Sequence, residues 1–168
     1  QHILRYLIQH LYFLELALKL VFKFRIPEIF TISITIINRI RFYGKGPEEN
    51  YIDRNNFATL GVYDQKLSEQ YWPYLRPQES GNKTQVRWWR VTNDKGMGLE
   101  FRSTVPMECS ALPYMTDDLS VGEEKAQQHS GDLIERPFTS VHISQRQMGI
   151  GCVNSWGAWP RPEYQMPY

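Results

Sequence analysis

Apolar and polar residues alternate over much of this chain, and the first such stretch covers residues 14–26. Successive side chains of a strand point to opposite faces, so a period of two predicts a half-buried β-strand. The same alternation recurs at residues 30–36, after Pro27 and Glu28, and again at residues 39–43. Consecutive half-buried strands with short breaks indicate an antiparallel sheet with one face toward solvent.

The second half of the chain continues this pattern. Residues 86–91 and 98–101 read as strands that flank the turn sequence NDKG at residues 93–96, which predicts a hairpin. Residues 138–144 form another expected strand. The polar and charged segment 116–128 predicts a short surface helix or an excursion between strands.

Charge and composition exclude several classes of function. Nineteen basic residues against eighteen acidic ones give a net charge of +1, so no basic surface for nucleic acid is expected. The first 26 residues are strongly apolar, but five charged residues interrupt them, and a membrane span needs about 20 mostly uncharged residues. We therefore expect neither nucleic acid nor a membrane as a partner.

Metal and cofactor sites are not expected either. The four histidines, at positions 2, 10, 129 and 142, are scattered without ligand spacing. Cys109 and Cys152 are the two cysteines, too few for a disulfide scaffold or a zinc site, and the sequence leaves open whether they pair.

Aromatic residues make up 14% of the chain and include five tryptophans, and two interpretations remain open for them. They either build a core of large rings or form a surface that binds sugars. Trp156 favours the second interpretation, because it lies in the glycine-rich segment GIGCVNSWG at residues 149–157, where its neighbours are small or polar.

Three motifs in this order carry a family resemblance: residues 43–54 (YGKGPEENYIDR), residues 74–84 (YLRPQESGNKT) and residues 149–157. With them the chain strongly resembles the C-terminal small-chain domain, domain 5, of bacterial glycoside hydrolase family 2 β-galactosidases. The resemblance covers residues 41–164, whereas residues 1–40 match only in their strand rhythm.

This resemblance implies an all-β fold, the galactose-mutarotase-like supersandwich of large antiparallel sheets. We expect residues 1–168 to form a single β-sandwich domain. The family usually continues into one more closing strand, so we expect a fragment of a larger β-galactosidase that lacks this C-terminal strand.

The resemblance also implies a role in carbohydrate binding. In the family, the tryptophan that corresponds to Trp156 reaches the mouth of a separate catalytic barrel and stacks on the sugar. We expect Asn154 and Ser155 to hold this loop through side-chain-to-backbone bonds, and both are also weaker candidates for contact with the sugar. An aromatic ring binds the C–H face of a pyranose by dispersion and weak C–H···π attraction. Trp159 lies outside the motif, and we expect it to pack in the protein interior.

The other two motifs suggest mainly structural roles. The polar residues of 43–54 are expected to satisfy one another, with Asp53 bound to Arg54 or Arg76 and Asn50 bound to the backbone. The same segment is also a possible docking surface for the barrel. Three further polar residues are weaker candidates for contact with the sugar: Arg76, Glu79 and His129.

Retaining glycoside hydrolysis requires two carboxyl groups about 5 Å apart, and no motif in this chain marks such a pair. In the resembled family both catalytic glutamates belong to the barrel, so we expect no catalytic residue here and no activity from this chain alone. The expected partners are a β-galactoside and the catalytic barrel or large subunit of the same enzyme.

Two alternatives remain open, a stand-alone carbohydrate-binding module and a protein similar to aldose 1-epimerase. The sequence does not distinguish a bacterial cytoplasmic from a periplasmic location.

Overall fold

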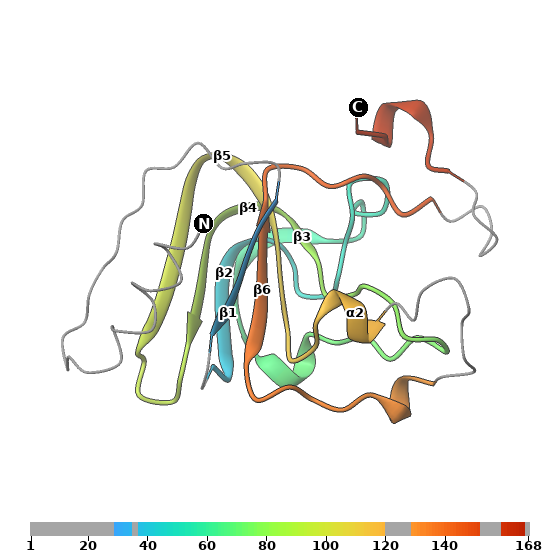
Figure 1. The fold of residues 1–168 in the computed structure, drawn as a ribbon. Helices are drawn as coiled ribbons and strands as arrows, with labels where there is room; N and C mark the ends of the chain where they lie inside the picture. Colours follow the sequence, from blue (N-terminus) through green and yellow to red (C-terminus); the bar gives the residue numbers. More distant parts are fainter. Residues whose placement is uncertain (1–28, 35–36, 120–128, 152–158, 167–168) are drawn as a thin grey trace.

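A computed structural model describes residues 29–34, 37–119, 129–151 and 159–166, and Figure 1 shows how these parts are arranged. The described residues form one antiparallel sheet in the order β1-β6-β5-β4-β2-β3. Its strands are β1 (Ile29–Ile34), β2 (Arg39–Gly46), β3 (Thr59–Lys66), β4 (Lys83–Thr92), β5 (Gly98–Leu112) and β6 (Thr139–Ser144). This sheet confirms the prediction of an all-β fold with a large antiparallel sheet.

One face of the sheet carries the main hydrophobic core. Ile40 and Phe42 alternate with polar neighbours on β2 and are fully buried. The Phe42 ring lies 5.1 Å from that of Trp89 on β4 and 5.2 Å from that of Tyr63 on β3, measured between ring centroids. Strands β5 and β6 complete this cluster with Met107, Cys109, Ala111, Val141 and Ile143.

The opposite face is partly charged. Arg39 and Asp64 pair at 2.8 Å across β2 and β3, and Glu100 on β5 binds both Arg90 and Arg102. The arginines are all well exposed, so these pairs add little to stability. The two faces thus correspond to the buried and solvated faces that the alternation predicts.

The predicted hairpin is confirmed between β4 and β5. The Asn93 side chain accepts bonds from the backbone N–H groups of Lys95 and Met97, each at 3.0 Å. Strands are also present within the predicted ranges 30–36, 86–91 and 138–144, and the polar segment begins with the one-turn helix α2 (Thr116–Leu119). The predicted strand at residues 14–26 lies outside the described residues.

One boundary prediction is wrong. The alternation at residues 39–43 predicts a strand that ends at Tyr43, but β2 continues to Gly46. Gly44 pairs with Gly61, and Gly46 pairs with Thr59 on β3. Ladder bonds use only backbone N–H and C=O groups, so glycine does not stop the pairing while a partner strand is present.

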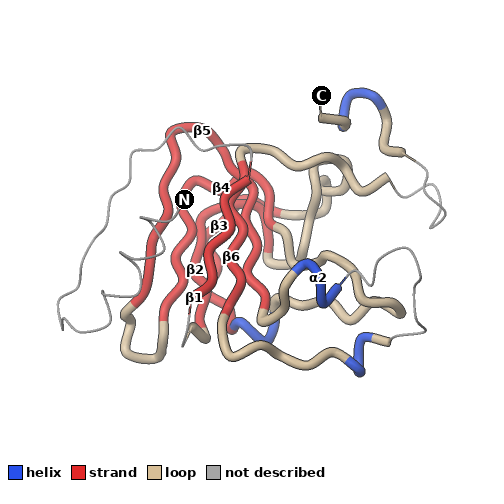
Figure 2. The backbone as a smooth tube through the Cα atoms, in the orientation of Figure 1, coloured by secondary structure: helices blue, strands red, loops and turns tan. Residues whose placement is uncertain are grey.

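The long connections gather beyond one side of the sheet, at the right of Figure 2. They include residues 47–58, residues 67–82 with the 3₁₀ turn η2 (Leu67–Glu69), and residues 145–151 that follow β6. The described residues of the three sequence motifs therefore lie mainly in these connections. In the described part of the chain, no helix has the length and apolar character needed to cross a membrane.

Candidate functional site

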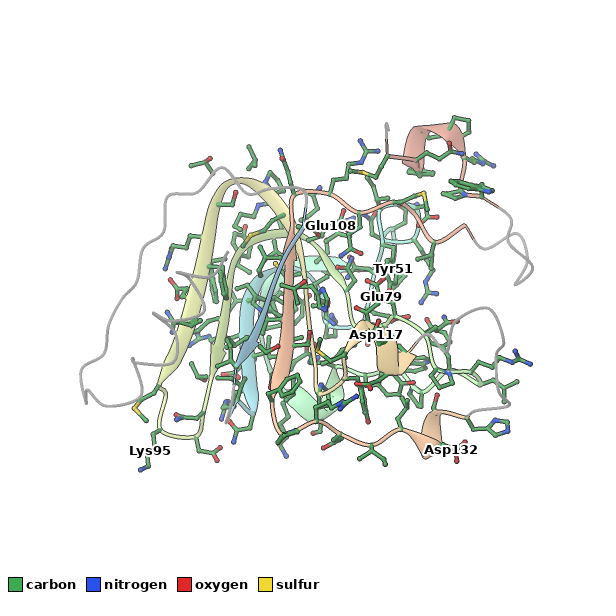
Figure 3. All side chains as sticks on the ribbon, viewed as in Figure 1. Tyr51, Glu79, Lys95, Glu108, Asp117 and Asp132 are labelled. Atoms are coloured by element: carbon green, nitrogen blue, oxygen red, sulfur yellow. The ribbon has the colours of Figure 1, made fainter. Side chains whose placement is uncertain are left out.

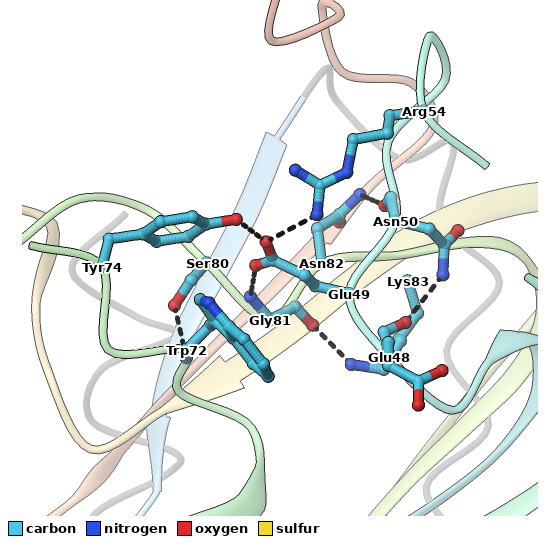
Figure 4. A network of polar contacts seen from close by, with 10 residues as sticks. All are labelled: Glu48, Glu49, Asn50, Arg54, Trp72, Tyr74, Ser80, Gly81, Asn82 and Lys83. Atoms are coloured by element: carbon cyan, nitrogen blue, oxygen red, sulfur yellow. Dashed lines mark hydrogen bonds and ion pairs between the residues drawn. The ribbon is translucent and has the colours of Figure 1, made fainter. Parts of the chain in front are cut away.

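Glu49 forms the centre of a polar network between two connections of the sheet (Figure 4). Its side chain is 5% exposed. One carboxylate oxygen accepts bonds from the Tyr74 hydroxyl and from Arg54 at 3.3 Å, and the other accepts the Gly81 backbone N–H at 2.8 Å. This carboxylate therefore fastens residues 74–81 to the segment that follows β2.

A second buried cluster lies beside the first. The Asn50 side chain donates to the backbone carbonyls of Lys45 and Glu48, at 2.9 and 3.0 Å, and its oxygen accepts from the Thr84 hydroxyl at 2.6 Å. These bonds confirm the expectation that Asn50 binds backbone. Glu49 and Asn50 also bind residues of the second motif, so the polar residues of 43–54 satisfy one another only in part.

Lys83 is buried at the start of β4, where its Nζ donates to Gln70 Oε1 at 3.2 Å and to the Gly81 carbonyl at 3.0 Å. Burial lowers its pKa to about 8, against the opposing effect of the nearby carboxylates of Glu49 and Glu48. The sequence offered no signal for this burial, because a lysine at a strand terminus is usually exposed.

Asp53 has a partner that the sequence did not indicate. Its two carboxylate oxygens accept the backbone N–H groups of Ile150 at 3.1 Å and Gly151 at 2.9 Å. The expectation paired Asp53 with Arg54 or Arg76, but Arg54 binds Glu49 and Arg76 is exposed. A contact across 97 residues has no local sequence signal, so only the folded structure reveals that the first and third motifs meet.

The strongest predicted site residue, Trp156, lies outside the described residues, as do Asn154, Ser155 and Cys152. The predicted sugar contacts of Trp156, Asn154 and Ser155 therefore stay predictions, and the structure does not test whether Cys152 pairs with Cys109. Trp159 is described, and the expectation that it packs in the interior is wrong, because it is 60% exposed. Trp159 belongs to neither of the two hydrophobic clusters that the described residues form.

The three weaker candidates are not gathered into one described cavity. Arg76, Glu79 and His129 are all exposed, and none of them lines either of two cavities, of about 370 and 320 Å³, among the described residues. The backbone N–H of His129 binds Asp132, which lies well away from Glu79 in Figure 3. Partial desolvation, with the negative charge of Glu49, raises the pKa of Glu79. A sugar contact by any of the three stays a prediction.

Glu108 is a buried carboxyl group that the sequence analysis missed. It is 6% exposed and accepts the Asn82 side-chain N–H at 3.1 Å. It borders the cavity of about 320 Å³, whose other lining residues are Ile52, Gln85, Pro106, Met107, Gln145 and Arg146. Burial raises its pKa to about 7, although bonds from Asn82 and the Gln147 backbone and the charge of Arg146 act in the opposite direction.

This raised pKa predicts a pH-dependent stability. Between pH 4.5 and 7 the folded protein keeps a proton on Glu108 that the unfolded chain has already released, so stability falls as pH rises through this window. We expect Glu108 to lower the free energy of unfolding by about 3 kcal/mol between pH 4 and pH 8. Urea unfolding at both pH values measures the change, and Glu108→Gln should remove most of it. The exposed Glu163→Gln serves as control, and an unaltered pH dependence in Glu108→Gln would contradict the assignment.

Within the described residues, no group of three or more His, Cys, Asp or Glu side chains is placed to hold a metal ion. Cys109 is a buried free thiol in the sheet, and burial raises its pKa well above the usual value. The absence of a metal or other cofactor from the function of this chain stays a prediction.

Comparison with known proteins gives a consistent result. The family model of the β-galactosidase small chain matches residues 18–168. The β-galactosidase of Priestia megaterium is 40% identical over 144 residues, which cover 84% of this chain and 13% of that protein. The β-galactosidase of Lactobacillus delbrueckii subsp. bulgaricus is 39% identical over 125 residues, which cover 74% of this chain and 12% of that protein. The β-galactosidase of Vibrio vulnificus is 28% identical over 127 residues, which cover 76% of this chain and 11% of that protein.

The chain thus spans only 11 to 13% of the length of these relatives. The match begins before the described sheet and includes all three sequence motifs and the Asp53 contact that joins two of them. The chain belongs to the β-galactosidase small chain family.

Proposed function

We propose that this chain is an accessory domain of a bacterial β-galactosidase and completes the active site for terminal β-D-galactosides. The observation that carries the proposal is the small-chain family match over residues 18–168, in a chain that covers only 13% of a β-galactosidase relative. Most of such an enzyme lies outside the matched region. Its catalytic barrel is the partner that we propose for this domain.

In this proposal the domain supplies Trp156 as an aromatic surface for the sugar and a docking surface for the barrel. An indole ring attracts the C–H face of a pyranose and leaves the sugar hydroxyls available for hydrogen bonds. The rigid polar network around Glu49 and the contact between Asp53 and the segment before Trp156 support this role, because a stacking residue must be held in place to contribute affinity. The side chains of Asn154 and Ser155 would form hydrogen bonds to the backbone of the same loop.

The hydrolytic step itself is proposed to depend on carboxyl groups outside this chain. A retaining mechanism uses a nucleophile and a general acid/base about 5 Å apart. We accordingly expect no turnover by this chain alone. The described sheet is proposed to form part of a galactose-mutarotase-like supersandwich, whose remaining sheets would cover it in the complete enzyme.

Trp156→Ala tests the proposal in the complete enzyme. Loss of the aromatic surface should weaken galactoside binding by about 1–3 kcal/mol, which is about 5- to 150-fold. Stacking acts on the bound substrate and on the transition state alike, so KM should rise more than kcat falls in steady-state kinetics. Trp156→Phe should restore part of the loss.

Trp72→Ala is the matched control, because Trp72 is 56% exposed in another connection and its KM should stay within about twofold of the wild type. An unchanged KM for folded, assembled Trp156→Ala would contradict the stacking role. Galactoside affinity in the isolated chain would instead favour a stand-alone carbohydrate-binding module.

A further inference from the structure

The cavity of about 320 Å³ lies where the pairing of β4 and β5 is irregular. Lys83 pairs with Cys109 and Val86 pairs with Met107, so β4 has one residue more than β5 between these two pairs. An extra residue on one strand is a β-bulge, and bulges often lie beside binding sites because they redirect a side chain. This bulge contains Gln85, which lines the cavity.

Gln85 has a strained backbone. Its φ is +56°, and it is the only non-glycine residue with positive φ in the described part of the chain. Glycine adopts this conformation readily, whereas a residue with a Cβ atom is strained in it. Strained residues gather at ligand sites, where the side chain has a use that offsets the strain. The glutamine at this position therefore indicates a function for the cavity.

Pro106 on β5 lies at the same irregularity. The regular register resumes at Trp88 and Arg102, and Pro106 has no residue opposite it on β4. Proline has no N–H group and cannot donate a ladder bond. The bulge and the proline thus interrupt the ladder on both strands at the wall of the cavity.

Two groups of opposite charge border the cavity. Glu108 is 6% exposed, and its carboxyl group accepts the Asn82 side-chain N–H at 3.1 Å. Arg146 donates through Nη2 to the Glu163 carbonyl at 2.8 Å, but its buried Nε has no hydrogen-bond partner among the described residues. An acceptor on a bound molecule would satisfy this donor. A molecule with a net charge would be repelled by one of the two groups, so the cavity favours a neutral ligand.

The remaining wall of the cavity is uncharged. Gln85 and Gln145 are exposed there, and each amide can donate and accept hydrogen bonds. Ile52, Pro106 and Met107 add an apolar surface. The hydroxyl groups of a polyol also donate and accept, while its C–H groups pack against apolar atoms. Pockets for small molecules begin at about 300 Å³, so this cavity has room for one ligand of modest size.

We propose that this cavity binds one small neutral polyol, a molecule of about the size of a monosaccharide. Its hydroxyl groups would satisfy Arg146 Nε and form hydrogen bonds with Glu108 and the two glutamine amides. This site goes beyond the function proposed for Trp156, and every residue that lines it belongs to the described part of the chain.

The first test measures the binding of myo-inositol, a neutral cyclic polyol that is not a galactoside, to the complete enzyme by saturation-transfer NMR. We expect saturable binding with Kd in the millimolar range. Gln85→Gly should raise Kd about tenfold, because it removes one amide from the cavity. The free energy of unfolding should change little, because relief of the strained φ offsets the greater freedom of glycine in the unfolded chain. Gln78→Gly removes the same side chain from an exposed position outside the cavity and should leave Kd unchanged.

The second test fills the cavity without removing its polar groups. Ile52 is half-buried at the wall, and the larger ring of Ile52→Trp should abolish saturable binding of myo-inositol up to about 100 mM. Ile134→Trp, at a position that is 83% exposed and outside the cavity, is the control and should bind like the wild type. Unfolding curves show that each variant is folded. A normal Kd in folded Gln85→Gly or folded Ile52→Trp would overturn the proposal, and so would the lack of saturable binding by the wild type up to about 100 mM.

Discussion

Trp89→Ala is expected to lower the free energy of unfolding of this domain by about 4 kcal/mol. Trp89 is fully buried on β4, and its ring contacts that of Phe42 at a centroid distance of 5.1 Å. Truncation to alanine would remove this buried surface and leave a cavity that the rigid strands on either side fill only in part. Urea unfolding followed by far-ultraviolet circular dichroism measures the loss.

The adjacent residue provides the control for this prediction. Trp88 points to the opposite face of the sheet, where it is half-buried and lies beneath the Arg90 guanidinium, 5.9 Å from its ring centroid. Trp88→Ala removes the same side chain from the same strand and should cost about 1 kcal/mol. Equal losses for the two variants would show that the core does not lie on the Trp89 face.

Glu49→Ala should destabilise the protein by about 3–4 kcal/mol. The buried carboxylate accepts bonds from Tyr74, Arg54 and the Gly81 N–H, and its removal would leave these donors without that acceptor. Arg54 is 40% exposed and can be hydrated, but the Gly81 N–H lies in a buried residue. The cost should therefore arise mainly from the buried donors, and the same urea unfolding measures it.

Glu48 is the matched control, because it precedes Glu49 directly and is exposed. Glu48→Ala should change the free energy of unfolding by less than about 0.5 kcal/mol. Glu49→Gln keeps one acceptor oxygen, so its loss in the free energy of unfolding should lie between those of Glu49→Ala and Glu48→Ala. A loss in Glu49→Ala no greater than that in Glu48→Ala would mean that the network does not hold residues 74–81 in place.

The strands could be predicted because their signal is local. Alternation on β2 follows from which face is buried, and the hairpin between β4 and β5 follows from its turn sequence. The strand order was not predictable, since β1 and β6 pair across more than a hundred residues. The end of β2 was misplaced for the same reason, because only the presence of β3 keeps Gly44 and Gly46 in the sheet.

The sequence indicated which segments carry the polar residues of the site, but it did not indicate most of their partners. The backbone bonds of Asn50 were predicted correctly, but Glu49 also binds residues 74–81, and the partner of Asp53 lies in the third motif. The buried state of Lys83 and the raised pKa of Glu108 depend on which strands and loops cover them. Trp159 was misjudged because an aromatic residue type does not reveal whether its side chain is covered, and this ring is 60% exposed in the described structure.

The most direct test of the account is a structure of the complete enzyme with a bound, unhydrolysed β-galactoside. We predict that the indole of Trp156 lies against the C–H face of the galactosyl ring at van der Waals distance, about 4 Å, with the Asp53 carboxylate bound to the N–H groups of Ile150 and Gly151. A sugar bound without any contact to Trp156, or bound where this domain does not reach, would contradict the central claim that the domain completes the active site.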